Sequence, residues 1–450
     1  MNKCLKFHDS EKYFEMFLLN KIYSRKFLPI ICTLTFLILS GFILNSYGNN
    51  EIELQVEDFE DPTICGGCHD AHYKEWQESW HSKAQIDQLY LAEYDMASED
   101  TNGLTDPFCT KCHSPISYMA GEIPVNSELG MKGISCDFCH TVSSTTGLGD
   151  GSFQNSPGDL KFGPIEEPID ANYHNNNYSE FYTKPEYCAM CHIVNHPING
   201  LPIMTTYQEW KNGPYASEGI TCQHCMMVES KGKAAITGSE RNIHGHIFYG
   251  GHFEYNLERA AKLDLKTISD IQPGKKALIQ VNVTNSGCGH ALPTGVSEVR
   301  ELWLDVTVID SSGKKVFENK QYYKPIFVDQ NDEDVGALFW RAVKMKSDNR
   351  IAPKETRVEQ LNFIVPADIT LPLTVNARLL YRLAPQELAD KAGVGILEII
   401  TLDEAELTIG GTTLPSSNLF IIGVVIIVIS IIIIWGILKK KSTGRVLHLF

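Results

Sequence analysis

The chain has 450 residues with 39 basic and 55 acidic side chains, which gives a formal net charge of −16 at pH 7. This charge argues against binding to nucleic acid or to an anionic membrane surface. It could steer a basic partner protein, or it could serve only solubility. Hydrophobic residues make up 43% of the chain, so it has enough apolar side chains to form buried cores.

The N-terminus carries the features of an export signal. Basic residues precede an apolar run over 27–44, and small residues follow at 46–48. We therefore predict that residues 1–48 are a signal peptide. Two alternatives stay open: the run could be an uncleaved N-terminal anchor, and translation could begin at Met16, which would leave residues 1–15 untranslated.

Four C-x-x-C-H motifs follow. In each, two thiols can add to the vinyl groups of a haem, and the histidine can take one axial position on the iron. A single C-x-x-C pair is also found in zinc sites and redox dithiols, but a histidine after every pair favours covalently bound haem c. The motifs are Cys65–Cys68–His69, Cys109–Cys112–His113, Cys136–Cys139–His140 and Cys188–Cys191–His192.

A fifth pair, Cys222 and Cys225, is followed by Met226 in place of histidine. The two thiols could hold a fifth haem, with Met226 or a distant histidine on the iron, because a thioether is an established axial ligand. They could instead form a disulfide, or be a site that no longer binds haem. The sequence therefore predicts four haems and leaves the fifth open.

The segment that contains these pairs has little hydrophobic periodicity. The stretch 70–93 is the exception, because Tyr73, Trp76 and Trp80 recur at helical spacing and predict a helix. Four or five macrocycles in about 200 residues would themselves form much of the core. Short helices and loops around the haems are therefore expected.

After residue 260 the pattern changes to the alternation of half-buried strands. Breaks at Pro, Gly and Asn favour an antiparallel sandwich, and residues 384–392 are expected to form a short helix. A mere spacer that lifts the haems away from a membrane is the alternative reading. The predicted strands are 277–284, 302–309, 314–323, 357–365, 375–381, 395–402 and 406–409.

Residues 419–438 carry no charge and are dominated by Ile and Val, which predicts one transmembrane helix. Basic residues begin at Lys439, so residues 439–450 are expected to be a cytoplasmic tail. The domains before the helix would then be anchored by the C-terminus on the extracytoplasmic side, at the periplasm or the cell surface.

Several segments of the chain resemble multihaem c-type cytochromes, a superfamily that includes the tetrahaem electron acceptor of hydroxylamine oxidoreductase and the pentahaem ammonia-forming nitrite reductases. The resemblance implies an α+β multidomain fold. A mostly helical and loop-rich multihaem cytochrome c domain (49–260) would precede an all-β sandwich-like domain (261–412) and the transmembrane helix. Met226 stands where such proteins have the motif histidine. The matching segments are 65–84, 133–142, 186–192, 206–227, 244–252 and 282–295.

Each iron needs a second axial ligand to be a low-spin electron carrier. The resemblance implies His81, His246, His252 and His290 as such ligands, and His174 is a further candidate in an Asn-rich loop before the fourth motif. Glycines on both sides of Cys288 would let the backbone approach a flat ligand near His290. Cys288 itself is expected to be a small buried residue, with a reactive thiol as the alternative. Three other histidines are interpreted as bystanders: His72, His196 and His224.

Two functions compete. Haems with both axial positions filled would transfer electrons between redox partner proteins or a membrane quinol-oxidising complex, which the surplus of histidines favours. A haem with an open position could instead reduce a small nitrogen or sulfur compound. The lysine-terminated motif of the related nitrite reductases is absent, so we favour the electron carrier. A third reading is an interaction subunit whose sandwich binds a larger assembly.

Overall fold

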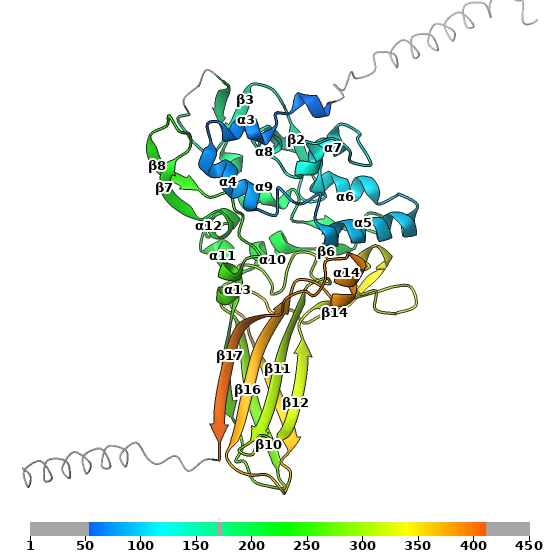
Figure 1. Cartoon of the computed structure of the whole chain (residues 1–450), viewed down its shortest axis with the longest axis vertical. Helices are drawn as coiled ribbons and strands as arrows, with labels where there is room; N and C mark the ends of the chain where they lie inside the picture. The colour runs from blue at the N-terminus through cyan, green and yellow to red at the C-terminus, as the bar shows by residue number, and fades with distance from the viewer. Residues whose placement is uncertain (1–53, 169–172, 411–450) are drawn as a thin grey trace, which may run out of the picture. The chain divides into compact units, whose positions relative to one another are not determined.

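The computed structural model describes residues 54–168 and 173–410 (Figure 1). The predicted signal peptide and the predicted transmembrane helix at 419–438 lie outside these residues. Within the described part, no helix has the length and apolar character needed to cross a membrane. We call residues 56–260 the haem-binding region and residues 261–410 the β region, and the two belong to one compact unit.

The haem-binding region consists of short helices joined by loops, and every C-x-x-C pair lies on or at the end of one of them. The longest is α5, with 14 residues. The helices are α3 (Pro62–Gly66), α4 (Asp70–Glu78), α5 (Gln88–Thr101), α6 (Asp106–His113), α7 (Pro115–Met119), α8 (Cys136–His140), α9 (Pro185–Ala189), α10 (Thr206–Asn212), α11 (Pro214–Ser217), α12 (Cys222–Met226) and α13 (Glu254–Ala260). The 3₁₀ turns are η1 (Val56–Asp58), η2 (Gly130–Lys132) and η3 (Glu180–Thr183).

The prediction of one helix over 70–93 was wrong, because the chain forms two helices there. Ser79 ends α4 in an extended conformation, and its hydroxyl donates a hydrogen bond to the carbonyl of Trp76. Asp87 then begins α5 by accepting a hydrogen bond from the backbone N–H of Leu89. Local side-chain bonds of this kind compete with helix propagation.

Only short strands occur in the haem-binding region. They pair as β1 with β2, β3 with β4, β5 with β6 and β7 with β8, and β3–β4 is the parallel pair. The bounds are β1 (Val142–Thr145), β2 (Phe153–Asn155), β3 (Leu160–Gly163), β4 (Asn175–Tyr178), β5 (Val194–Asn195), β6 (Pro202–Met204), β7 (Glu229–Lys233) and β8 (Glu240–His244).

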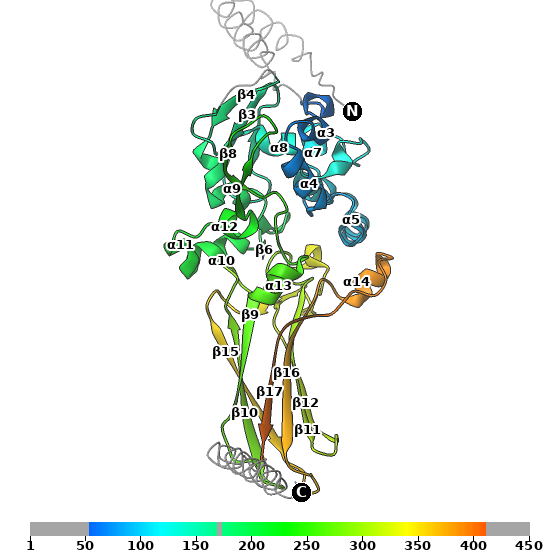
Figure 2. The ribbon, with the colours of Figure 1, turned by 60° about the vertical axis from the view of Figure 1, so that its left-hand side comes forward.

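The β region contains two antiparallel sheets, which Figure 2 shows as separate layers. One sheet has the order β15-β10-β9, and the other has the order β12-β11-β16-β17. The bounds are β9 (Ala261–Thr267), β10 (Lys276–Asn285), β11 (Glu301–Asp310), β12 (Lys315–Tyr322), β15 (Thr356–Ile364), β16 (Leu373–Arg382) and β17 (Ile400–Ile409). A small pair, β13 (Pro325–Val328) with β14 (Lys344–Asp348), the 3₁₀ turn η4 (Phe339–Arg341) and the helix α14 (Gln386–Lys391) complete the region.

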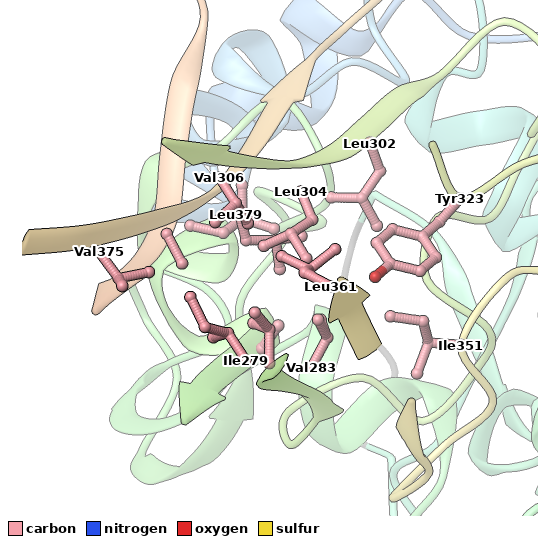
Figure 3. Packing of buried hydrophobic residues seen from close by; sticks show 14 of the residues in the cluster. Ile279, Val283, Leu302, Leu304, Val306, Tyr323, Ile351, Leu361, Val375 and Leu379 are labelled. Carbon is pink, nitrogen blue, oxygen red and sulfur yellow. The ribbon is translucent and has the colours of Figure 1, made fainter. Parts of the chain in front are cut away.

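The two sheets face each other across an aliphatic core (Figure 3). Alternate residues of β10, such as Ile279 and Val283, point inward and have no exposed surface. Leu304 of β11 and Leu379 of β16 meet them from the opposite sheet and are equally buried. This burial pattern is the one expected for a two-layer sandwich.

Five of the seven predicted strand segments correspond to single observed strands, namely β10, β11, β12, β15 and β16. The prediction at 395–402 was wrong over 395–399, which form no strand, and Ile400 begins β17. The predicted strand at 406–409 is the second half of β17. The helix expected within 384–392 is α14.

Hydrogen bonds and ion pairs join the haem-binding region to the β region. Glu209 on α10 pairs with Arg350 at 2.7 Å, and both side chains are nearly inaccessible, with 11% and 7% exposed. Asp100 on α5 accepts hydrogen bonds from Trp340 Nε1 and Arg341, each at 2.7 Å. These contacts, of which the Glu209–Arg350 pair is buried, do not suit a loosely attached spacer.

Candidate haem sites

The cysteines of all five pairs are free thiols in the structure, so Cys222 and Cys225 form no disulfide. Nine of these ten residues are half-buried, and Cys225 is exposed. Short helices present both thiols of a pair on neighbouring turns, with Cys136 and Cys139 of α8 as an example. Such a pair can reach two vinyl groups of one macrocycle.

Three motif histidines are oriented by backbone carbonyls. His69 Nδ1 lies 2.6 Å from the carbonyl of Ala234, and His140 Nδ1 lies 2.7 Å from that of Phe162. His113 has the same relation to a carbonyl, at 2.8 Å. A carbonyl oxygen only accepts, so Nδ1 carries the proton in each ring. Nε2 is then left unprotonated, as a metal ligand must be.

Three of the four motif histidines, namely His69, His140 and His192, face a second histidine at a distance that suits an iron between them. The ring centroids are 6.2 Å apart for His69 and His174, 6.4 Å for His192 and His81, and 6.3 Å for His140 and His246. An imidazole nitrogen binds a first-row metal at about 2.0 Å, and its ring centre lies roughly 1.1 Å farther, so two rings on one iron are about 6.2 Å apart. The side chains therefore fit haem iron with two histidine ligands at three of the motifs.

The environment of these rings favours the neutral form. Burial lowers the pKa of His81 to about 3, and the charge of His192 adds to the effect. Burial likewise lowers the pKa of His246 to about 3. The pKa values of His140 and His192 are also lowered, mainly by burial. Neutral imidazole is the form that ligates a metal.

The second motif is different. The ring of His113 stacks on Tyr90 of α5, with centroids 3.7 Å apart and planes inclined by 5°. Within the described residues, no histidine ring lies opposite His113 at the separation found for the other three motifs. Its second axial position therefore has no histidine assigned to it.

The fifth pair has its own local arrangement. Met226 ends α12 and is half-buried, and its backbone carbonyl accepts from the N–H of Tyr249 at 3.1 Å. His224 is exposed, and its Nδ1 accepts from the N–H of Thr221 at 3.1 Å, so it caps the helix. Cys288 is half-buried, and desolvation together with the nearby Cys225 thiol raises its pKa to about 12.

The remaining candidate ligands occupy defined positions. His290 is half-buried, and its Nδ1 lies 2.9 Å from the carbonyl of Ala291, which leaves Nε2 available. His252 stacks on Trp80 with centroids 4.0 Å apart, and burial lowers its pKa to about 3. No described histidine ring is paired with either residue at an iron-bridging distance.

Two histidines interpreted as bystanders have structural contacts. His196 is buried, and its Nε2 lies 2.9 Å from the carbonyl of Trp340, so it joins the two regions. The ring of His72 lies 4.5 Å from that of His246. His72, Glu75 and His246 are close enough to hold a metal ion together, but His246 is the residue that faces His140.

Thiols from different motifs lie close to one another. These contacts connect the first motif with the third, the second with the fourth, and the fourth with the fifth. The pairs are Cys65 with Cys136, Cys112 with Cys191, and Cys188 with Cys222. Because each thiol marks the edge of an attached macrocycle, neighbouring haems would meet edge to edge.

A further proximity links the third motif to the fourth. The charge of Cys139 acts on both Cys188 and Cys191, so these thiols lie near one another. All five pairs therefore belong to one connected set, in which the fourth motif has three neighbours. The sequence contained no sign of this order, because the contacts join helices that are distant in the chain.

Sequence reasoning did not identify Tyr90, Glu93 or Glu298 as functional residues. Tyr90 contacts His113, and the two glutamates are buried near the second motif. Glutamates in a sequence are most often exposed, so nothing in the pattern distinguished these two from the others. Only their position in the fold does.

The chain is similar to known proteins in its first three motifs and in its fold. The family described as "Cytochrome c554 and c-prime" matches residues 64–141, which hold the first three motifs. The crystal structure of a penta-heme cytochrome c552 from Thermochromatium tepidum is similar, with 22% identity and a TM-score of 0.62. The match covers 78% of this chain and 99% of that protein.

Other comparisons are weaker. The CARDB domain of a Pyrococcus furiosus protein, solved with di-metal ions, matches 33% of this chain and 84% of its own at 13% identity, with a TM-score of 0.18. No curated protein matches the sequence.

Proposed function

We propose that this chain is a multihaem c-type cytochrome that transfers electrons through a connected set of covalently bound haems. The observation that carries the proposal is the set of three histidine pairs with centroids 6.2, 6.3 and 6.4 Å apart. An iron held between two histidines has no position for a substrate. Its role is then to accept an electron and pass it on.

The side chains support this role in two ways. Bound haem supplies the one-electron chemistry through its ferric and ferrous states. Carbonyl partners orient the motif rings of His69 and His140, and burial lowers the pKa of His140, which favours the neutral imidazole that would bind the iron. Because thiols of different motifs lie close together, the haems attached to them would also be close, and short distances favour fast electron transfer from one haem to the next.

We further propose that Cys222 and Cys225 attach a fifth haem. Their thiols are free, and the Cys222 thiol lies close to the Cys188 thiol of the fourth motif, as expected if the pair belongs to the connected set of haem sites. A similar solved structure is a penta-heme protein. Met226 or His290 is the proposed iron ligand, and a thioether ligand would raise the potential of this haem above that of the histidine pairs.

The proposed location is the extracytoplasmic side of a membrane, with the C-terminus as anchor. The apolar segment 419–438 and the basic residues from Lys439 support it, as does the N-terminal export signal. The proposed partners are redox proteins or a membrane quinol-oxidising complex, since a tethered carrier can exchange electrons only with proteins within its reach.

A second candidate function is reduction of a small nitrogen or sulfur compound at an open haem. The observation in its favour is His113, whose ring faces Tyr90 instead of a second histidine. In this second candidate function, the substrate would bind at the haem of the second motif and not at the haem beside Met226. This function would add one reactive haem to the electron carriers.

Carbon monoxide binding to the reduced holoprotein tests the proposal. Irons with two histidine ligands bind it poorly, so the optical change should involve only a minority of the haems. His246→Ala should add one haem that binds carbon monoxide, whereas His196→Ala should add none, because His196 contacts a backbone carbonyl. Binding by most haems of the unaltered protein would overturn the proposal.

A further inference from the structure

Two buried glutamates outside the haem motifs have unusual surroundings. Glu93 lies on α5, and Glu298 lies just before β11. Glu93 Oε1 and both carboxyl oxygens of Glu298 are buried and have no hydrogen-bond partner. Glu93 is half-buried as a whole residue, so its stem reaches the surface while its carboxyl group does not. A buried polar group without a partner is unfavourable, so two such groups need a reason.

The charges around this pair are mixed. Burial raises the pKa of Glu93 to about 8, with the charges of Glu298 and Asp87 acting in the same direction and Arg300 against it. Burial also raises the pKa of Glu298 to about 8, and Arg350 and Arg300 act against it. The two carboxyl groups can therefore exchange protons near neutral pH.

One side of the pair faces the second haem motif. Glu93 follows Tyr90 by three residues on α5, so both lie on the same face of that helix. Tyr90 stacks on the ring of His113, and its hydroxyl is buried without a partner. Burial and the charges of Asp106 and Glu93 raise the pKa of Cys109 to about 12, which shows that Glu93 is near the attachment thiol.

The other side of the pair faces a cavity. Glu298 lines a cavity of about 260 Å³ together with Glu301, Tyr322, Lys324 and Ala337. One water takes about 30 Å³ in the liquid, so the cavity has room for several. Glu301 and Lys324 give its lining charged groups beside which water can lie. A proton would pass from such water to the Glu298 carboxyl group, whose oxygens themselves have no exposed surface.

We propose that Glu93 and Glu298 are the proton acceptor for the haem attached at Cys109 and Cys112, supplied from the cavity beside Glu298. When one electron from a neighbouring haem would reduce that iron from ferric to ferrous, one of the two carboxylates would take up one proton, which comes from the bulk solvent and is relayed through the cavity water. The proton is released to the cavity when the electron leaves. The inference rests on haem attachment at the second motif and on the proposed electron transfer between haems.

The added negative charge is the physical cause of this coupling. An electron placed close to Glu93 raises the proton affinity of the pair, because it disfavours a second negative charge in a buried site. The charge of Arg300 acts in the opposite direction on both carboxyl groups, while its Nη1 donates to the carbonyl of Leu383 at 2.7 Å. Electron arrival and proton uptake would then occur together.

Infrared difference spectra of the holoprotein, reduced minus oxidised, test the proposal. We expect the band of a protonated carboxyl group to grow on reduction and to be absent in Glu93→Gln and Glu298→Gln. Glu99→Gln is the control, because Glu99 lies on the same helix but is exposed. The midpoint potential of one haem should fall as the pH rises through about 8, and less so in the two variants.

The outcomes separate this inference from the proposed function. A band that persists in both glutamine variants, or a potential independent of pH in the unaltered protein, would overturn the inference. Loss of covalent haem at Cys109 and Cys112, measured by mass, would instead overturn the premise. Both variants replace a carboxyl group with an amide of the same shape, and the haem count of each shows whether it has assembled.

Discussion

The haem-binding region and the β region bury their side chains in different ways. Of the twelve largest fully buried side chains, ten belong to the β region, and only Ile116 and Val142 come from the haem-binding region. A typical cluster of the latter contains Ala189, Ile193 and Tyr207, with Trp210 beside it. The β region thus has a conventional aliphatic core, whereas the haem-binding region needs its cofactors to complete one.

The largest expected effect comes from withholding the haems. Without covalent attachment, the haem-binding region should lose its protection against amide hydrogen exchange, because few aliphatic side chains remain to hold it. Strands β10, β11 and β16 should stay protected, since their core is made of protein alone. Exchange measured by mass on the full chain tests this. Equal protection of both regions in the haem-free chain would show that the haem-binding region does not need its haems to stay folded.

A substitution inside the sandwich should act on one region alone. Leu304→Ala removes a side chain with no exposed surface, and we expect it to lower the free energy of unfolding of the β region by about 2–5 kcal/mol. The haem absorption spectrum should not change. Val358→Ala on β15 is the control, because that side chain is 48% exposed and its loss should cost about 0.5 kcal/mol or less. Equal losses would show that the core does not depend on Leu304.

The pH dependence of stability should reveal the carboxyl pair. The pKa values of Glu93 and Glu298 are raised from 4.5 to about 8, so the folded state holds protons that the unfolded state releases. The free energy of unfolding should therefore fall as the pH rises from about 4.5 to about 8, by at most about 1.4 kcal/mol per pH unit for each group.

Denaturant unfolding followed by circular dichroism measures this slope. Glu93→Gln should make it shallower, because one of the two protons is no longer released, and Glu99→Gln should leave it unchanged. An identical slope in all three proteins would mean that Glu93 is ionised in the folded state.

The sequence predicted the β region better than the arrangement of the haem-binding region. Strand β10 alternates buried and half-exposed residues, and that period is visible in the sequence. The break between α4 and α5 depends on the Ser79 hydroxyl, which a periodicity of aromatic residues does not reveal. Motif spacing identified the haem sites, because attachment needs a fixed local pattern.

Pairing of the histidines could not be predicted in the same way. The sequence marked His81 and His246 as ligand candidates, but nothing in it joined them to His192 and His140, since these contacts depend on how separate loops fold together. His252 was named as a ligand candidate together with His246, but in the structure its ring stacks on Trp80 and not opposite a motif histidine.

The central claim is that most irons have both axial positions filled. A low-temperature electron paramagnetic resonance spectrum of the oxidised protein, with haem quantified in the same sample, tests it most directly. We predict low-spin signals for at least the three haems between His69 and His174, His81 and His192, and His140 and His246. Any high-spin signal should come from a minority of the haem and include the second motif. High-spin signals from most of the haem would contradict an electron carrier.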